Sequence, residues 1–293
     1  MIKKAFLEIK PIYLAISLSL TLPAVLIRNY AWQLILKEQK IKISFFRSLK
    51  IFFIGYFYGS FTPGFIGQIV RVPYLKQETG EPYGKLFVNT LIDSTLRSIA
   101  QYLLIILGAI LVIQLYPNMF WIDIIILALT ILAFFYFIKK ERGEKIFYLI
   151  IKYLIPKKLK TDFYRFVNTF YYDFPRINRL VIPLFLGLIT LIIGFSQEYI
   201  IVMSLGLDIP YHYFILLFPF ANIAGYLPIT FAGLGIRELT SMLIFSTLFA
   251  VPQEKIFVAT IVGFIITNVF TGFIGFLVSL TETRDKKVIA ASR

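Results

Sequence analysis

The sequence contains no cysteine and a single histidine, His212. The absence of cysteine excludes disulfides and thiolate chemistry, and a single histidine argues against a histidine metal cluster or proton relay. Charged residues make up only 16% of the 293 residues, against 58% that are hydrophobic, and the mean hydropathy is +0.80. Soluble domains contain about 25% charged residues. This chain therefore has too little polar surface for a soluble protein, and an integral membrane protein is expected.

Sequence motifs for catalysis are also missing. The chain has no metal-ligand spacing, no nucleophile motif and no phosphate-binding P-loop. We therefore expect no enzymatic activity, no metal and no cofactor. ATP-driven movement of a substrate would need a partner chain.

The positive charge is strongly clustered. The net charge is +14, and 11 of the 30 Lys and Arg residues lie within 139–179, with six more within 28–50. Basic loops between apolar runs are typical of membrane orientation and of binding to anionic headgroups. This distribution favours a membrane partner over nucleic acid.

Long apolar runs predict the architecture. A membrane-spanning helix needs about 20 mostly apolar residues. The runs between charged residues cover 11–27, 51–70, 98–122, 124–138, 180–197, 213–236, 239–253 and 256–281. We expect an all-α, polytopic helix bundle of about seven or eight transmembrane helices, forming one domain over residues 1–293 in the cell membrane.

The basic segment 139–179 is expected on the cytoplasmic side, because positive loops stay inside. The run 51–70 either crosses the membrane or enters and returns on the same side; the second possibility keeps the basic residues of 28–50 inside. Within 139–179, the stretch 146–155 and a stripe of four phenylalanines predict amphipathic helices. These helices lie either in the headgroup plane or against the protein's own cytoplasmic face. The stripe consists of Phe163, Phe166, Phe170 and Phe174.

Glycine and proline interrupt two of the apolar runs in the same way. The segments 55–71 (GYFYGSFTPGFIGQIVR) and 221–238 (ANIAGYLPITFAGLGIRE) each place a proline eight or nine residues before an arginine, Arg71 or Arg237. A broken helix survives in a membrane only where protein or water surrounds it, and paired broken helices in two halves of a chain indicate a transporter site. The alternative is that glycine and proline are simply frequent in membrane helices and that the arginines reach the interface.

These residues resemble a known family. Arg28 and Trp32, followed by the first motif and then far downstream by LPITFAGLGIRE, are similar to the transmembrane domain of the lysylphosphatidylglycerol synthase and flippase-like family, in a stand-alone, archaeal-type form. The resemblance implies a multi-helix membrane domain that handles lipids with charged headgroups and moves them between leaflets. It does not imply aminoacyl transfer, which belongs to a separate soluble domain.

The chain departs from the family's pattern at several charged positions. Gln68 stands where the resemblance implies an acid, Asp93 and Ser94 stand in place of a Glu–Arg pair, and Asn268 replaces an arginine of the last helix. Arg97, four residues after Asp93, is a candidate for the displaced cation.

The residues expected to bind the headgroup follow from these motifs. Backbone donors around the glycines and the two motif arginines would hold a phosphate, while carboxylates at membrane depth would set the local charge. Asp93 and Arg97 are expected to neutralise each other across one helix face, and Glu198 to face an arginine from another helix. The candidate binding residues are Gly64, Gly67, Gln68, Arg71, Asp93, Arg97, Glu198, Gly233, Gly235, Arg237 and Glu238.

Three functions are compatible with this sequence. The leading hypothesis is a translocase-like protein that binds an anionic phospholipid or polyprenyl-phosphate lipid between the two broken helices. The second is a non-transporting scaffold for a membrane glycosyltransferase or lipid-modifying enzyme, docked at 139–179, and the third is an embedded enzyme that uses Asp93 or Glu198. The first hypothesis predicts that the two motifs meet, with Arg71 and Arg237 in one shared cavity.

Overall fold

The computed structural model describes residues 2–114, 117–226, 230 and 233–291. Within these residues the chain is helical and forms no strand, so the all-α prediction is confirmed. The elements, in chain order, are α1 (Ile2–Glu8), α2 (Pro11–Ser19), α3 (Thr21–Glu38), α4 (Phe45–Ser60), η1 (Pro63–Val70), α5 (Arg71–Thr79), α6 (Tyr83–Leu111), α7 (Pro117–Ile138), α8 (Lys140–Leu154), η2 (Lys157–Leu159), α9 (Lys160–Phe170), η3 (Ile177–Leu180), α10 (Val181–Ser204), α11 (Tyr211–Ala224), α12 (Ile236–Phe249), α13 (Gln253–Phe264), the π-helix η5 (Ile265–Val269) and α14 (Phe270–Ala291).

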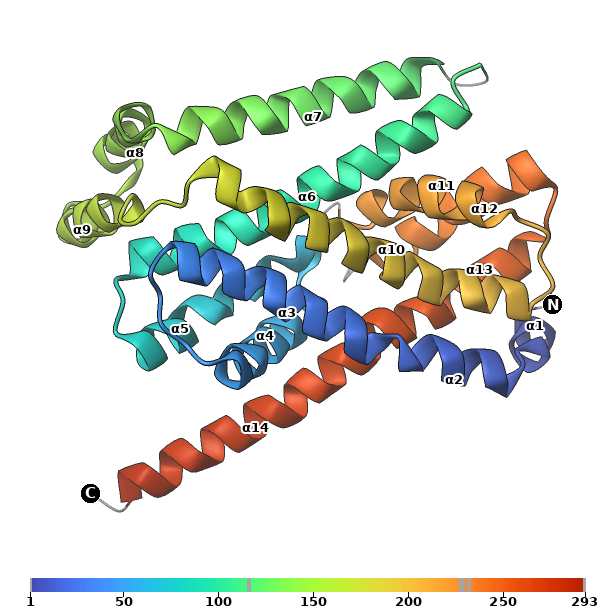
Figure 1. The fold of residues 1–293 in the computed structure, drawn as a ribbon, viewed down its shortest axis with the longest axis horizontal. Helices are drawn as coiled ribbons and strands as arrows, with labels where there is room; N and C mark the ends of the chain where they lie inside the picture. The colour runs from blue at the N-terminus through green and yellow to red at the C-terminus, as the bar shows by residue number, and fades with distance from the viewer. Residues whose placement is uncertain (1, 115–116, 227–229, 231–232, 292–293) are drawn as a thin grey trace.

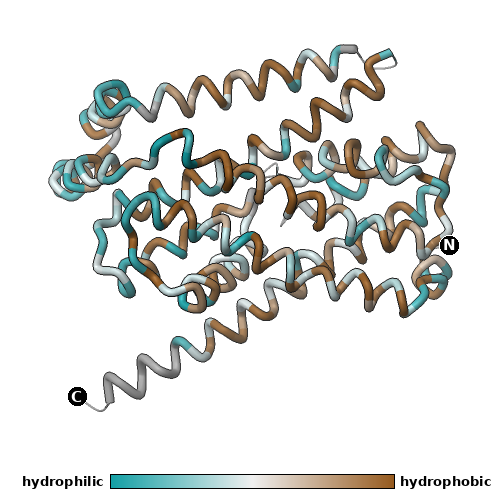
Figure 2. The backbone as a smooth tube through the Cα atoms, viewed as in Figure 1, coloured by the Kyte–Doolittle hydropathy of each residue, from teal (hydrophilic) through white to brown (hydrophobic). Residues whose placement is uncertain are grey.

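Four helical segments of the described chain are long and apolar enough to cross a membrane, and a fifth is possible if the bent pair α7–α8 counts as one span. The expected seven or eight spans are therefore not confirmed. Figures 1 and 2 show these long, largely apolar helices running side by side. The four segments are Pro11–Glu38, Tyr83–Leu111, Ile177–Ser204 and Gln253–Glu282.

Ion pairs define the two ends of this bundle. At one end, which we call the basic end, Arg47 pairs with Glu78 and with Glu282, and Asp173 pairs with Lys40 and Lys85. These contacts gather the starts of α4 and α6, the end of α5 and the segment after α9 (Figure 1).

The opposite end, which we call the distal end, is also fixed by polar contacts. Lys255, at the start of α13, pairs with Glu8 at 2.8 Å and donates to the carbonyl of Leu205 at 3.0 Å. The backbone N–H of Lys10 donates to Ser204 Oγ. The N-terminus, the end of α10 and the start of α13 therefore lie together (Figure 1).

The first glycine–proline motif forms a helical hairpin that enters from the basic end. Ser44 caps α4, whose 16 residues reach only about 24 Å at 1.5 Å per residue. The chain then turns back through η1 and α5 to Glu78, which pairs with Arg47 at the start of α4. The run 51–70 therefore enters and returns, as the second alternative predicted, and does not cross the bundle.

The second motif forms a matching hairpin from the distal end. Helices α11 and α12 have 14 residues each, about 21 Å, which is shorter than the roughly 30 Å of a bilayer core. Helices α11 and α12 pack against each other. After α12 the chain continues into α13, whose start at Lys255 lies at the distal end. Helices α11 and α12, which lie within the runs 213–236 and 239–253, are thus the two arms of a hairpin.

The phenylalanine stripe of the basic segment lies against the protein itself. On α9, Val167 and Phe170 are buried, and the Phe166 ring contacts Phe87 of α6 at 5.5 Å. A Cβ at Gly84 of α6 would overlap the carbonyl oxygen of Phe166, so glycine is needed for this close packing. Phe166 and Phe170 of the stripe therefore pack against the protein's own face. Phe163 of the stripe is exposed, as are Leu149 and Tyr153 of α8.

Asp173 should make the stability of the basic end depend on pH. Hydrogen bonds from Lys40 and Lys85 hold the pKa of Asp173 below its usual value. A lowered carboxyl pKa stabilises the fold above the unfolded-state pKa, and this contribution is lost as the pH falls through the folded-state pKa. Asp173→Asn should therefore lower the free energy of unfolding by about 1 kcal/mol at neutral pH, and the difference from wild type should shrink as the pH falls below about 3.9, the ordinary pKa of an aspartate.

Thermal unfolding in detergent, at neutral pH and at a series of acidic pH values, measures this effect. Asp208→Asn is the matched control, because Asp208 is exposed and has no ion pair among the described residues. A difference between wild type and Asp173→Asn that stays constant with pH would contradict the prediction.

Candidate functional site

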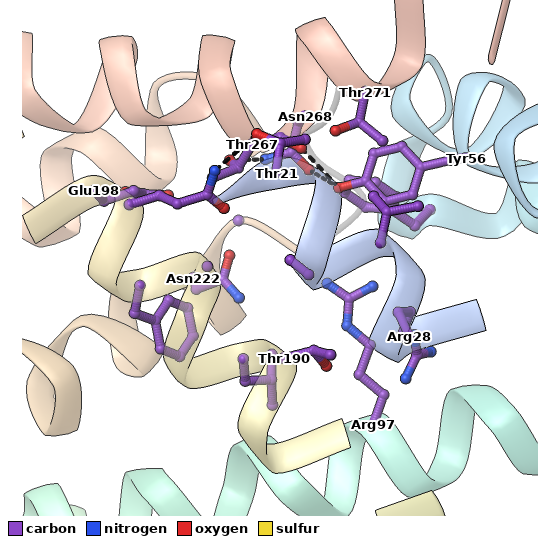
Figure 3. A pocket seen from close by; sticks show the side chains of 18 of the residues that line it. Thr21, Arg28, Tyr56, Arg97, Thr190, Glu198, Asn222, Thr267, Asn268 and Thr271 are labelled. Atoms are coloured by element: carbon purple, nitrogen blue, oxygen red, sulfur yellow. Dashed lines mark hydrogen bonds between the residues drawn. The ribbon is translucent and has the colours of Figure 1, made fainter. Parts of the chain in front are cut away.

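The two hairpins enter from opposite ends and meet at their tips. Phe65 of the first hairpin contacts Tyr226 of the second edge to face, with ring centroids 5.6 Å apart. A cavity of about 120 Å³ lies beside this contact, enclosed by α3, α4, α6, α10 and the π-helix η5 as well (Figure 3). Its polar lining consists of Thr21, Arg28, Tyr56, Gln68, Arg97, Thr190, Gln197, Glu198, Asn222, Tyr226, Arg237, Thr267, Asn268 and Thr271.

The tip of the first hairpin depends on close backbone approach at Gly67. Its N–H donates to Thr62 Oγ1 at 2.7 Å, and a Cβ there would overlap the carbonyl oxygen of Tyr58. Phe65 has a positive φ of 56°, which is costly for an aromatic residue. This turn places Phe65 and Gln68 on the cavity wall.

The tip of the second hairpin uses glycine in the same way. Gly233 and Gly235 have φ of 77° and 92°, and a Cβ at Gly233 would overlap the carbonyl oxygen of Gly225. The N–H of Gly235 donates to Glu238 Oε2 at 2.5 Å, so this acid caps the start of α12. Part of the motif, including Pro228, lies outside the described residues.

The motif glycines therefore have a steric role. The N–H groups of Gly67 and Gly235 are already occupied within their own hairpins. Gly67, Gly233 and Gly235 are not among the cavity-lining residues of the described chain, and the surroundings of Gly64 lie outside the described part. The expectation that their backbone donors face a headgroup is not supported by this arrangement.

Arg71 does not reach the cavity, contrary to the prediction. Its side chain is 1% exposed, packs on Gly55, and lies over the rings of Trp32 and Phe52 at 5.1 and 5.5 Å. It donates to Gln68 Oε1, so Gln68 separates it from the cavity.

Asp93, like Arg71, is separated from the cavity and does not line it. Its Oδ2 accepts from Arg71 at 3.1 Å and from Arg28 at 3.0 Å, with the carboxylate 2% exposed. Among the described residues no direct ion pair joins Asp93 to Arg97, because the carboxylate is bound by arginines from α3 and α5 instead. Arg28, which was not among the candidate residues, lines the cavity.

Arg97 projects from α6 into the cavity, beside Arg28 (Figure 3). Its guanidinium donates to the hydroxyl of Tyr226 at 3.1 Å. Within the described residues it has no ion pair. It is therefore a cation in an apolar bundle that retains free donors toward the cavity.

Arg237 and Glu198 line the same cavity, whereas the prediction placed both Arg71 and Arg237 there. Arg237 is 3% exposed, pairs with its neighbour Glu238, and lies over Phe264 at 4.3 Å. Glu198 is 5% exposed, and its Oε2 has no hydrogen-bond partner among the described residues. Its stem packs on Gly263, where a Cβ would overlap Glu198 Cγ.

The π-helix η5 supplies cavity residues that sequence reasoning did not select. A π-bulge shifts the side-chain phase of a helix and is frequent at functional sites. Here it brings Thr267 and Asn268 to the cavity, where the Tyr56 hydroxyl lies 3.0 Å from Asn268 Oδ1 (Figure 3). The only indication in the sequence that Asn268 belongs to the site was that it stands where the family resemblance implies an arginine.

The site therefore belongs to a helical membrane protein in which two opposed hairpins meet beside an arginine-lined cavity. The sequence profile of the family described as lysylphosphatidylglycerol synthase TM region matches residues 2–275. The chain belongs to this family, and its function is lipid-related. No curated protein matches the chain.

Proposed function

We propose that this protein binds the phosphate of an anionic lipid in the central cavity and moves that lipid between the leaflets of the cell membrane. A phospholipid and a polyprenyl phosphate present the same phosphate chemistry. Binding and movement, not a reaction, are the proposed activity, and membrane lipids are the proposed partners. The segment 139–179, at the basic end, is proposed to face the cytoplasm.

The observation that carries this proposal is Arg97. A cation in a membrane-embedded site is costly unless a counter-charge is present. Arg28 and Arg237 have carboxylate partners, whereas Arg97 has only the neutral Tyr226 among the described residues. A phosphate in the cavity supplies the missing negative charge and accepts two parallel hydrogen bonds from the guanidinium.

The opposed hairpins support movement as well as binding. Each hairpin enters from one end of the bundle, and the tips meet at Phe65 and Tyr226. Paired broken helices around a central site are the arrangement of transporters with alternating access.

Replacing Arg97 tests the binding site. Hydrogen bonds to charged groups contribute about 1.5–3 kcal/mol, so Arg97→Gln should weaken the binding of fluorescent phosphatidylglycerol in phosphatidylcholine nanodiscs by at least about tenfold. Arg165→Gln is the matched control, because Arg165 is exposed on α9 and its loss changes the net charge equally. Equal affinities for the two variants, or equal binding of phosphatidylcholine by wild type, would contradict a cavity site for anions.

Leaflet exchange distinguishes the translocase from a scaffold for a membrane enzyme. The purified chain in proteoliposomes should expose fluorescent phosphatidylglycerol of the inner leaflet to a membrane-impermeant quencher, and Arg97→Gln should slow this exchange. A scaffold would bind without exchange, and the empty liposomes provide the background rate.

A further inference from the structure

Glu198 is a buried carboxyl group that the proposed binding of phosphate does not use. It lines the cavity from α10, is 5% exposed, and its Oε2 has no hydrogen-bond partner among the described residues. Buried polar atoms normally have partners, and an orphaned one calls for a functional explanation. Because its stem packs on Gly263, where even a Cβ would overlap it, the carboxyl group has little room to withdraw toward α13.

The charged groups around Glu198 come from several elements. Arg28 on α3, Arg97 on α6 and Arg237 on α12 line the same cavity, with Glu238 bound to Arg237 behind it. Arg71 and Asp93 back the wall next to Arg28. With every group ionised, four arginines oppose three carboxylates, which leaves one net positive charge.

A phosphate that enters this cavity meets Glu198. Glu198 and Arg237 line the same cavity, so a phosphate that binds Arg237 lies beside the carboxyl group. An ionised carboxylate there repels the anion in a poorly screened site. A protonated carboxyl group instead donates its O–H to a phosphate oxygen, which satisfies the orphaned atom.

We propose that the cavity binds its phosphate anion together with one proton, and that Glu198 carries that proton. The proton is taken from water when the anion binds and returns to water when the anion leaves. This inference rests on the proposed function, because it assumes a phosphate anion in the cavity.

Phosphatidylglycerol in phosphatidylcholine nanodiscs is the appropriate probe. Its phosphodiester keeps one negative charge between about pH 5.5 and pH 8.5, so a change in affinity over this range reports on the protein. Wild-type affinity should fall as the pH rises, approaching about tenfold per pH unit when one proton is linked to binding. Glu198→Gln should bind tightly throughout the range, with no dependence on pH.

Asp123→Asn is the matched control. Asp123 is also a buried acid with an unpartnered oxygen, but it lies on α7 and is not a cavity-lining residue. This variant should keep the wild-type dependence on pH. A flat wild-type profile, or a Glu198→Gln profile that still slopes, would overturn the inference while leaving the proposed function intact. No preference for phosphatidylglycerol over phosphatidylcholine at any pH would overturn the proposed function itself.

Direct proton counting on the wild-type protein does not depend on any variant. Calorimetric titration with phosphatidylglycerol in two buffers of different ionisation enthalpy measures the protons taken up per lipid bound. At the upper end of the pH range, we expect about one proton per lipid. Binding without proton uptake would overturn the inference.

Discussion

Replacing Asp93 with asparagine should lower the free energy of unfolding by about 3–5 kcal/mol, the cost of removing one partner from a buried ion pair. Asp93 is 2% exposed, and its Oδ2 accepts from both Arg28 and Arg71. Asparagine keeps the shape but removes the charge, so Arg71, at 1% exposure, becomes a buried cation without a counter-charge. Unfolding in mixed detergent micelles measures the change.

The control for this effect is Asp173→Asn, which removes a carboxylate that is also paired with two cations, but at the exposed basic end. Its expected cost is about 1 kcal/mol. In a double-mutant cycle, Arg71→Met combined with Asp93→Asn should cost clearly less than the sum of the two single changes, because the charges are removed together. Additive costs would mean that the two groups do not depend on each other.

The contacts of Asp93 with Arg28 and Arg71 show which features of the site the sequence could predict and which it could not. Composition was enough to predict an all-helical membrane protein, and the paired glycine–proline motifs were enough to predict two special segments that meet. The partner of Asp93 was not predictable from helical spacing, since Arg28 and Arg71 approach it from other helices. Helical spacing favoured Arg97 as the partner of Asp93, but the Arg97 side chain lines the cavity instead.

The glycine–proline motif does not specify which type of helix precedes Arg71, and therefore does not specify where the Arg71 side chain points. Residues 63–70 form a 3-10 helix, in which side chains three residues apart align. Arg71 follows this helix as the first residue of α5 and donates to Gln68, with Gln68 on the cavity wall and Arg71 behind it. Likewise, the π-helix shifts Asn268 onto the wall, and no simple periodicity of 3.6 predicts that shift.

The expected number of spans is not confirmed for a related reason. Counting apolar runs assigns each run to a crossing, but α4, α11 and α12 are too short to cross. Their apolar character comes from packing inside the bundle, where Phe214, Phe218 and Phe245 of α11 and α12 are fully buried. Hydropathy does not distinguish a lipid-facing helix from one buried in protein.

Replacing Gly67 with valine should open the first hairpin and remove the binding site with it. Even a Cβ at this position would overlap the carbonyl oxygen of Tyr58 and lie 2.8 Å from Thr62 Oγ1, the acceptor of the Gly67 N–H. Forcing side-chain atoms into such a contact typically costs about 1–3 kcal/mol. The backbone of η1 must move away from α4, since neither atom belongs to a flexible side-chain end.

This movement displaces Phe65 and Gln68 from the cavity wall and breaks the contact between Phe65 and Tyr226. We therefore expect Gly67→Val to lower the unfolding temperature and, at temperatures where it remains folded, to weaken phosphatidylglycerol binding in nanodiscs. Gly194→Ala is the control for stability, because a Cβ there meets no atom within 4 Å and alanine favours a helix over glycine. A Gly67→Val protein as stable as Gly194→Ala would show that the hairpin tip tolerates a wider spacing, and the steric role assigned to this glycine would then be wrong.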